Sequence, residues 1–249
     1  LERIRDLSLR ILREAGLPAR RLAGVGIGAP GIIDGREGVV LSSPNLPRWR
    51  RIPLKAWLER SLRRRVVIDN DANVAAFGEK WLGAGRGCRD LVVYTVGTGI
   101  GGGIILDGRI FHGHCFAAGE LGHLTVMPDG PACNCGNRGC VEALASATAI
   151  AREGRRVLRG RTRGVLNDLA KGKPSNVTAK HVFTAARRGD AAARKIVAGA
   201  GRALGIAVAG TVNLLNPELV VIGGGVSLAG NLLLRPVRAE VRSRALKDS

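Results

Sequence analysis

Aromatic side chains are scarce in this sequence: three Trp, one Tyr and four Phe make up 3% of its 249 residues. Proteins that bind single-stranded nucleic acid stack the bases on aromatic rings, so this scarcity argues against that role. Lys and Arg outnumber Asp and Glu by 39 to 20, but they are scattered along the chain. We therefore ascribe the net charge of +19 to composition and expect no nucleic-acid partner. A nonspecific polyanion binder, whose binding would collapse as salt rises, stays as an alternative.

Long uncharged apolar stretches are also missing. None reaches the roughly 18 residues that a membrane-spanning helix requires. Residues 1–13 contain four Arg in place of the apolar block of a secretory signal. Hydrophobic residues nevertheless reach 45%, enough for a core in one large domain or two small ones. We expect a globular, cytoplasmic protein without a membrane partner or internal repeats.

The apolar residues change period repeatedly along the chain, between the spacings typical of strands and of helices. Strands are predicted at 22–29, 38–41, 66–68, 91–96, 101–106 and 219–222. Helices are predicted at 1–16, 54–62, 72–82, 143–169, 179–215 and 228–246. This alternation is typical of the α/β class.

One short segment concentrates potential metal ligands: it holds His123, Cys133, Cys135 and Cys140 within 18 residues. Three thiols and an imidazole fit tetrahedral Zn²⁺, and the glycines between them allow so short a loop to turn around an ion. A disulfide is the alternative, disfavoured because no secretory signal is seen and because one residue separates Cys133 from Cys135. Four protein ligands leave no open position, so we expect the zinc to be structural.

Two carboxylates, Glu120 and Glu142, bracket this segment. On a metal-clamped loop they would accept hydrogen bonds from several hydroxyl groups at once, which suits a polyol such as a sugar. His123 would bind the metal through one ring nitrogen and donate a hydrogen bond from the other. The alternative is that both carboxylates are merely solvated, as Glu side chains on loops usually are.

A glycine-rich segment follows the predicted strand at 91–96. It satisfies the GxGxxG pattern of dinucleotide-binding proteins, but a second strand follows it where that pattern requires a helix. A glycine-rich connection between strands can instead present consecutive backbone N–H groups to a phosphate. A plain hairpin turn is the alternative. The candidate nucleotide-binding residues are Gly97, Thr98, Gly99, Gly101 and Gly102.

A second glycine group, Gly223, Gly224 and Gly225, separates a predicted strand from a predicted helix. Such a connection would let a nucleoside or a phosphate approach the backbone closely, or would simply form a tight turn.

The predicted strand at 66–68 leads through Asp69, Asn70 and Asp71 into a helix. Ligands of open α/β sheets bind at the carboxyl ends of strands, so a carboxylate here is well placed for chemistry. Asp71 could take the proton from a hydroxyl group that attacks a phosphate. The alternative role of Asp71 is the N-cap of the helix.

Seven stretches, in the same order as in the family, resemble the ROK sugar kinases and repressors, and most closely the ROK glucokinases. They are GAPGIID (28–34), SPNLPRW (43–49), DNDANVAAFGE (69–79), VGTGIGGG (96–103), AGELGH (118–123), CNCGNRGCVEA (133–143) and VVIGGGVS (220–227). The resemblance covers the chain from about residue 20 to its end.

The resemblance implies an actin-like ATPase (ribonuclease H-like) α/β fold, with two lobes around a central cleft, that transfers the γ-phosphate of ATP to a hexose with Mg²⁺. Glucose, converted to glucose 6-phosphate for glycolysis, is the expected substrate, although other hexoses and N-acetylhexosamines stay open. Asp71 would be the catalytic base, and the glycine groups would bind the nucleotide. Zinc would be held by His123 and the three cysteines. The sugar would be held by Asn70, Glu120, His123, Glu142, Asn45 and Gly31.

Residues 1–70 would form an incomplete small lobe, completed by a helix at 236–249, and residues 71–235 the larger lobe. These kinases begin with a strand that carries an Asp-x-Gly-Gly-Thr type motif, which is not found before Leu1. We therefore expect truncated N-terminal strands and poor kinase activity of this chain. The family also suggests a homodimer or homotetramer. A sugar-sensing repressor that has lost its DNA-binding module, or an inactive kinase fragment, is the alternative.

Overall fold

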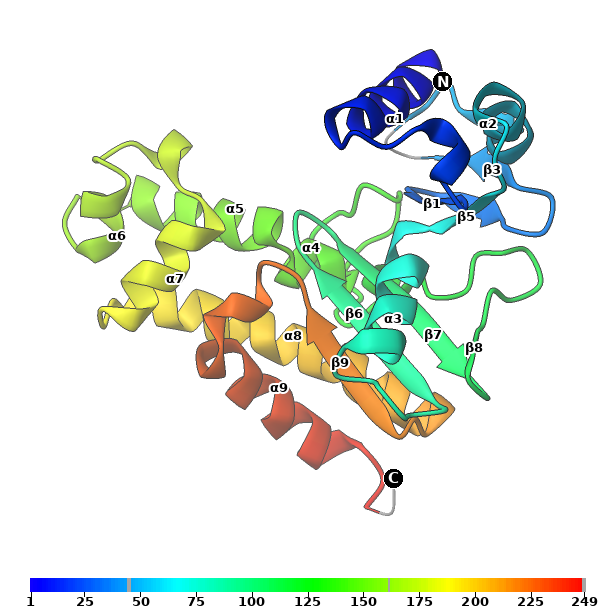
Figure 1. The fold of residues 1–249 in the computed structure, drawn as a ribbon. Coiled ribbons are helices and arrows are strands. Elements are labelled where there is room, and N and C mark those ends of the chain that lie inside the picture. The colour runs from blue at the N-terminus through cyan, green and yellow to red at the C-terminus, as the bar shows by residue number, and fades with distance from the viewer. Residues whose placement is uncertain (44–45, 161, 248–249) are drawn as a thin grey trace.

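Separate hydrophobic clusters, one in the small lobe and two in the larger lobe, divide the protein into two lobes (Figure 1). The computed structural model describes residues 1–43, 46–160 and 162–247. Leu58 and Ile68 belong to the small core, and Tyr94 and Leu204 belong to the larger one. The two lobes predicted for this α/β chain are therefore present.

The small lobe is built from short strands and two amphipathic helices. Its elements are α1 (Glu2–Glu14), β1 (Val25–Ala29), β2 (Ile32–Asp34), β3 (Val39–Ser42), β4 (Arg50–Ile52), α2 (Leu54–Leu62) and β5 (Val66–Asn70). Strands β2, β3 and β4 form an antiparallel sheet, whereas β1 pairs in parallel with β5. Since parallel strands end at the same edge, the residues after β1 and after β5 meet there.

A four-stranded sheet forms the centre of the larger lobe, in the order β8-β7-β6-β9. Its strands are β6 (Leu91–Val96), β7 (Ile100–Leu106), β8 (Arg109–Ile110) and β9 (Leu219–Gly223). Alternate residues of β6 face opposite sides: Tyr94 and Val96 join the main core, whereas Val93 packs with Ala76 of α3 (Asp71–Leu82). Helix α3 therefore covers one face of the sheet, and the main helical core covers the other (Figure 1).

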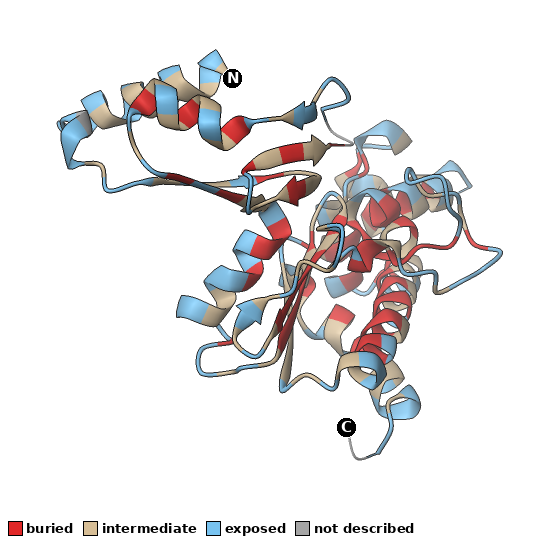
Figure 2. Cartoon of the chain, turned by 90° about the vertical axis from the view of Figure 1, so that its right-hand side faces the viewer, coloured by how far each residue is buried: buried red, intermediate tan, exposed pale blue. Residues whose placement is uncertain are grey.

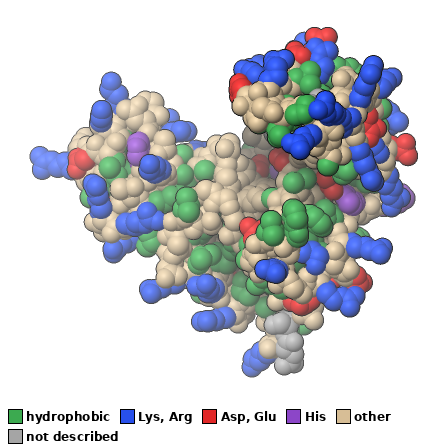
Figure 3. Space-filling model, viewed as in Figure 1, with side chains coloured by type: hydrophobic (Ala, Val, Ile, Leu, Met, Phe, Trp, Pro, Cys, Tyr) green, Lys and Arg blue, Asp and Glu red, His purple; other side chains and the backbone are tan. Residues whose placement is uncertain are grey.

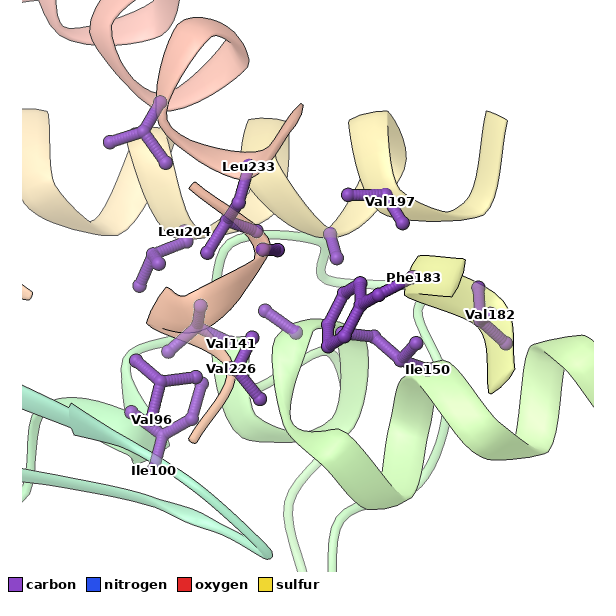
Figure 4. Close-up of a cluster of buried hydrophobic side chains, with 14 of the residues drawn as sticks. Val96, Ile100, Val141, Ile150, Val182, Phe183, Val197, Leu204, Val226 and Leu233 are labelled. Atoms are coloured by element: carbon purple, nitrogen blue, oxygen red, sulfur yellow. The ribbon is translucent and has the colours of Figure 1, made fainter. Parts of the chain in front are cut away.

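The remaining helices of the larger lobe pack against one another, and Figure 2 shows buried residues in both lobes. These helices are α4 (Val141–Ala145), α5 (Ala147–Arg159), α6 (Val165–Leu169), α7 (Ala179–Arg187), α8 (Ala191–Leu215) and α9 (Asn231–Arg244). Within the described ranges, α8 alone is long and apolar enough to cross a membrane, but 56% of its apolar window is buried inside the protein. This burial is typical of a core helix, and α4, α5, α7 and α8 all contribute side chains to the core shown in Figure 4.

The single helix predicted at 143–169 is interrupted in the structure. Ser146 ends α4 and begins α5, because its hydroxyl oxygen accepts a hydrogen bond from the Ala149 N–H at 3.2 Å. Gly160 then ends α5. A serine N-cap inside an apolar periodic stretch divides one predicted helix into two.

The prediction that residues 236–249 complete the small lobe is wrong for the described residues of that segment. Val237 and Val241 of α9 pack into the core of the larger lobe. Two glycines of α8 allow this close approach: a Cβ atom on Gly201 would lie 2.7 Å from the Leu233 carbonyl oxygen, and one on Gly205 would lie 2.8 Å from that of Val237. The boundary between the lobes at residues 70 and 71 stays a prediction.

Candidate active site

A cavity of about 640 Å³ collects candidate residues from both lobes. Its lining includes Gly31, Asn70, Asp71, Gly97, Thr98, Gly99, Gly101, Gly102, Glu120, His123, Cys135, Glu142 and Gly224. Gly223 and Gly225 flank Gly224 without lining the cavity, and Asn45 lies outside the described residues. Segments far apart in the sequence therefore meet at one place.

The junction between β5 and α3 carries the candidate base. Asn70, not Asp71, is the N-cap of α3: its Oδ1 atom accepts hydrogen bonds from the Ala72 N–H at 2.8 Å and the Asn73 N–H at 3.3 Å. The alternative role considered for Asp71 is thus filled by its neighbour. Asp71 is the first helical residue, it is exposed and it lines the cavity, and its Oδ1 atom accepts a hydrogen bond from the Ala72 N–H at 2.9 Å.

The other end of the Asn70 amide joins the end of β5 to the turn that follows β1. Its Nδ2 group donates to the carbonyl oxygen of Gly31, 2.9 Å away. Gly31 has a φ of +111°, and a Cβ atom there would lie 2.1 Å from the Ser42 carbonyl oxygen, so only glycine fits. Most of the hydrogen-bonding capacity of Asn70 is therefore used inside the protein, which leaves one N–H for a ligand.

The predicted metal ligands converge. The ligand atoms of His123, Cys133, Cys135 and Cys140 all lie within 4.8 Å of one another. His123 Nδ1 lies 3.7 Å from Cys133 Sγ, and the sulfur atoms of Cys135 and Cys140 are also 3.7 Å apart. That sulfur separation is far longer than a disulfide bond of about 2 Å, so the disulfide alternative is wrong for this pair. The Cys₃His set fits tetrahedral zinc.

The three thiols have different surroundings. Burial raises the pKa of Cys133, and it raises the pKa of Cys140 to about 12. The backbone N–H of Asn137 lowers the pKa of Cys135. A cation bound by this set must displace the thiol protons, which is what thiolate-binding metals such as zinc do.

The two carboxylates beside the metal ligands are held differently. Glu142 Oε2 accepts a hydrogen bond from the backbone N–H of Ile100 at 2.8 Å, so this carboxylate is fixed against the glycine hairpin. Glu120 Oε2 lies 3.8 Å from His123 Nε2. The imidazole thus directs Nδ1 to the sulfur atoms and Nε2 to a carboxylate, the two-sided arrangement typical of metal-binding histidines.

The glycine-rich segment connects two antiparallel strands, as predicted: Val96 of β6 pairs with Ile100 of β7. Gly97, Thr98 and Gly99 form the connection. Its position is fixed by α5, because the Gly97 and Thr98 carbonyl oxygens accept hydrogen bonds from the Ala147 N–H and the Thr148 hydroxyl, both at 2.8 Å. No helix follows, so the dinucleotide-fold alternative is wrong.

Residues 10–249 match the ROK family. The chain belongs to the ROK family. A glucokinase of Thermotoga maritima is 48% identical over 217 residues, which cover 87% of this chain and 68% of that protein. The solved structure of a ROK family glucokinase from Streptomyces griseus, in complex with glucose and AMPPNP, matches this chain with a TM-score of 0.84 and 37% identity. The match covers 98% of this chain and 78% of the glucokinase chain. A xylose repressor of Caldicellulosiruptor bescii is 35% identical over 241 residues, 96% of this chain and 59% of that protein.

These similarities confirm the predicted sugar kinase of the ROK family and its actin-like α/β fold. The basic side chains of this ROK protein are spread over both lobes in Figure 3, in agreement with a compositional origin of the charge. The roles of the individual site residues stay predictions.

Sequence reasoning missed several residues at the site of this ROK protein. Thr95 and Phe116 line the cavity. Asp69 and His112 form a close pair beside it, with His112 Nε2 located 2.8 Å from Asp69 Oδ2. Nothing in the sequence pairs these two residues, because 43 positions separate them.

Proposed function

We propose that this protein phosphorylates a hexose, most specifically glucose, with ATP as donor and Asp71 as the general base. The observation that carries the proposal is the shared cavity, in which the exposed carboxylate of Asp71 lies with two further carboxylates and the glycine hairpin. A polyol and a polyanion can bind there side by side.

Asp71 would take the proton of the attacking hydroxyl group. Phosphoryl transfer requires mainly positioning and neutralisation of charge, so one oriented carboxylate suffices as base. Its orientation follows from the Asn70 cap, because the cap fixes the first turn of α3, where Asp71 lies.

The remaining hydroxyl groups of the sugar would bind to Glu120, His123 and Glu142, with Asn70 and Gly31 as neighbours. Carboxylates accept hydrogen bonds from hydroxyl groups, and two of them on a braced loop would define the position of the ring. Glucose is favoured over other hexoses because the ROK relative from Thermotoga maritima is a glucokinase.

The nucleotide would bind at the glycine hairpin and at Gly224, which lies against the backbone of Val96 just before the hairpin and also lines the cavity. Thr98 adds a hydroxyl donor beside backbone N–H groups, a donor set that suits phosphate oxygens. ATP supplies the transferred group, and Mg²⁺, when bound, offsets its charge.

Zinc would be held by His123, Cys133, Cys135 and Cys140 in a structural role. All four ligand positions come from the protein, so the ion would brace the segment between Glu120 and Glu142 and take no part in the transfer.

The test compares a full-length version of the protein with its Asp71→Asn variant. We expect glucose binding and zinc content to be retained while transfer from ATP to glucose falls by about 10²- to 10⁴-fold. Retained turnover in Asp71→Asn would refute the assignment of the base. The unsubstituted protein serves as the reference for both binding and transfer.

A sugar-sensing function is the second candidate, favoured by the 35% identity to a xylose repressor. The same experiment separates the two, since a sensor would bind sugar without transfer of phosphate. A cytoplasmic location and a homodimer or homotetramer stay predictions.

A further inference from the structure

One loop of the larger lobe contacts the small lobe at two points. Residues 112–118, the bridging loop, follow β8 and precede Glu120. At one point His112 Nε2 lies 2.8 Å from Asp69 Oδ2 of β5. At the other, the guanidinium of Arg36 lies over the Phe116 ring, 5.8 Å from its centroid. The proposed mechanism assigns no role to either contact.

Asp69 is hydrogen-bonded to the residues on either side of Asp71, the proposed base. Its Oδ1 atom accepts hydrogen bonds from the Asn70 N–H at 2.7 Å and from Asn73 Nδ2 at 3.0 Å. Its side chain is 16% exposed, and Asn73 is buried. One carboxylate thus ties the last residue of β5 to the first turn of α3, and Asp71 lies between the two donors.

His112 is also joined to the segment that leads to Glu120. The Ala118 N–H donates to the His112 carbonyl oxygen at 3.1 Å, which closes the base of the bridging loop. Gly119 follows and packs closely against β7, since a Cβ atom on Gly119 would lie 2.8 Å from the Gly102 carbonyl oxygen. Glu120 comes next, so the backbone of His112 is joined by one hydrogen bond to the segment that carries this carboxylate.

We propose that Asp69 and His112 are a positioning pair that sets the spacing between Asp71 and Glu120. The inference rests on the proposed hexose function, and neither residue lines the cavity. The carboxylate requires a proton on His112 Nε2, so the ring donates and the carboxylate accepts. The pair joins elements of different lobes, and its hydrogen bond therefore fixes the two sides of the site to each other.

The test is calorimetric titration with glucose. His112→Ala removes the donor, and since a hydrogen bond to a charged group contributes about 1.5–3 kcal/mol, we expect the Kd to rise at least about tenfold. His112→Gln places an amide N–H near the position of Nε2 and should restore the Kd to within about threefold of the original. His114→Ala is the matched control, because His114 is exposed on the same loop and does not line the cavity. Zinc content should stay unchanged in all three.

The outcomes distinguish a failure of the hexose function from a failure of the positioning role alone. If the unsubstituted protein does not bind glucose, the hexose function fails and the positioning role falls with it. If it binds glucose and His112→Ala binds equally well, or if His114→Ala is as weak as His112→Ala, only the positioning role is overturned. A double variant, Asp69→Ala with His112→Ala, should bind no worse than the weaker single variant, because both remove the same contact. Nitrogen NMR of the unsubstituted protein, which needs no variant, must find His112 protonated at Nε2.

Discussion

Glu142 and Ile100 join the metal-ligand segment to the glycine hairpin: the Oε2 atom of Glu142 accepts the backbone N–H of Ile100 at 2.8 Å. Glu142 lies two residues after Cys140, and Ile100 directly follows Gly99. The carboxylate expected to bind sugar is therefore fixed by the connection expected to bind phosphate. A substitution in the metal-ligand segment should therefore affect the glycine hairpin, and a substitution in the hairpin should affect the position of Glu142.

Gly99→Ala tests this connection. A Cβ atom on Gly99 would lie 2.5 Å from Glu142 Oε2, so the carboxylate must move and lose the Ile100 N–H. We expect the affinity for glucose, measured by calorimetry, to fall by about tenfold, the effect of losing one charge-assisted hydrogen bond.

Gly78→Ala in α3 is the control for that variant, since no atom lies within 4 Å of its added Cβ. It should keep the affinity for glucose and raise the free energy of unfolding by up to about 1 kcal/mol, because alanine favours a helix. Equal affinity of Gly99→Ala and Gly78→Ala would contradict the proposed role of the contact.

Removal of zinc should loosen the segment between Glu120 and Glu142. A strong chelator, or Cys140→Ser at a buried ligand position, should lower Tm by roughly 5–10 °C, the equivalent of about 2–3 kcal/mol for a chain of this size. Differential scanning calorimetry together with elemental analysis gives both quantities. Cys88→Ser, outside the metal cluster, should keep one zinc per chain and the original Tm. A chelated protein with unchanged Tm would argue against a structural metal.

Stability should fall at high pH because of Tyr94. Burial raises the pKa of this phenol to about 12, and its hydrogen bond with Thr211 opposes the shift. The folded state favours the neutral phenol, so this stabilisation is complete below pH 10 and is lost as the pH rises towards 12. The loss amounts to roughly 2–3 kcal/mol at most.

Absorbance of the tyrosinate follows this titration directly, because Tyr94 is the one tyrosine in the chain. Denaturation curves at several pH values should show a steeper loss of stability in the original protein than in Tyr94→Phe. The Thr211 hydroxyl keeps its own acceptor in this variant, the Ala207 carbonyl oxygen at 3.0 Å. Parallel curves for the two proteins would contradict the shift.

The cap of α3 depends on Asn70 and not on Asp71. Asn70→Ala should lower the free energy of unfolding by about 1 kcal/mol or somewhat more, whereas Asn70→Asp should keep the cap, since Asn and Asp cap equally well. Chemical denaturation measures both variants. A loss of stability in Asp71→Asn as large as that in Asn70→Ala would reverse this assignment.

The sequence predicted helices and strands well where the spacing of apolar residues, or a single side chain, determines the local structure. The helix at 54–62 has the predicted bounds in the structure, because apolar residues recur every four positions on its buried face. The convergence of the four candidate metal ligands also followed from spacing, since a short loop rich in glycine has few other ways to arrange three cysteines. The alternative that Asp71 caps the helix named the wrong neighbour, because Asn and Asp are nearly equivalent there and only the backbone geometry distinguishes them.

The amino-acid order by itself determined the α/β alternation, the Cys₃His cluster and the strand-to-strand glycine connection, because each depends on residues close together in the chain. Tertiary structure alone decided that α9 packs on the larger lobe, that one cavity gathers Asp71 with Glu120 and Glu142, and that His112 meets Asp69. These contacts join segments that are distant in the sequence, so they depend on how whole elements pack. The parallel pairing of β1 with β5 and the glycines that allow a neighbouring backbone to come close are what bring these segments together.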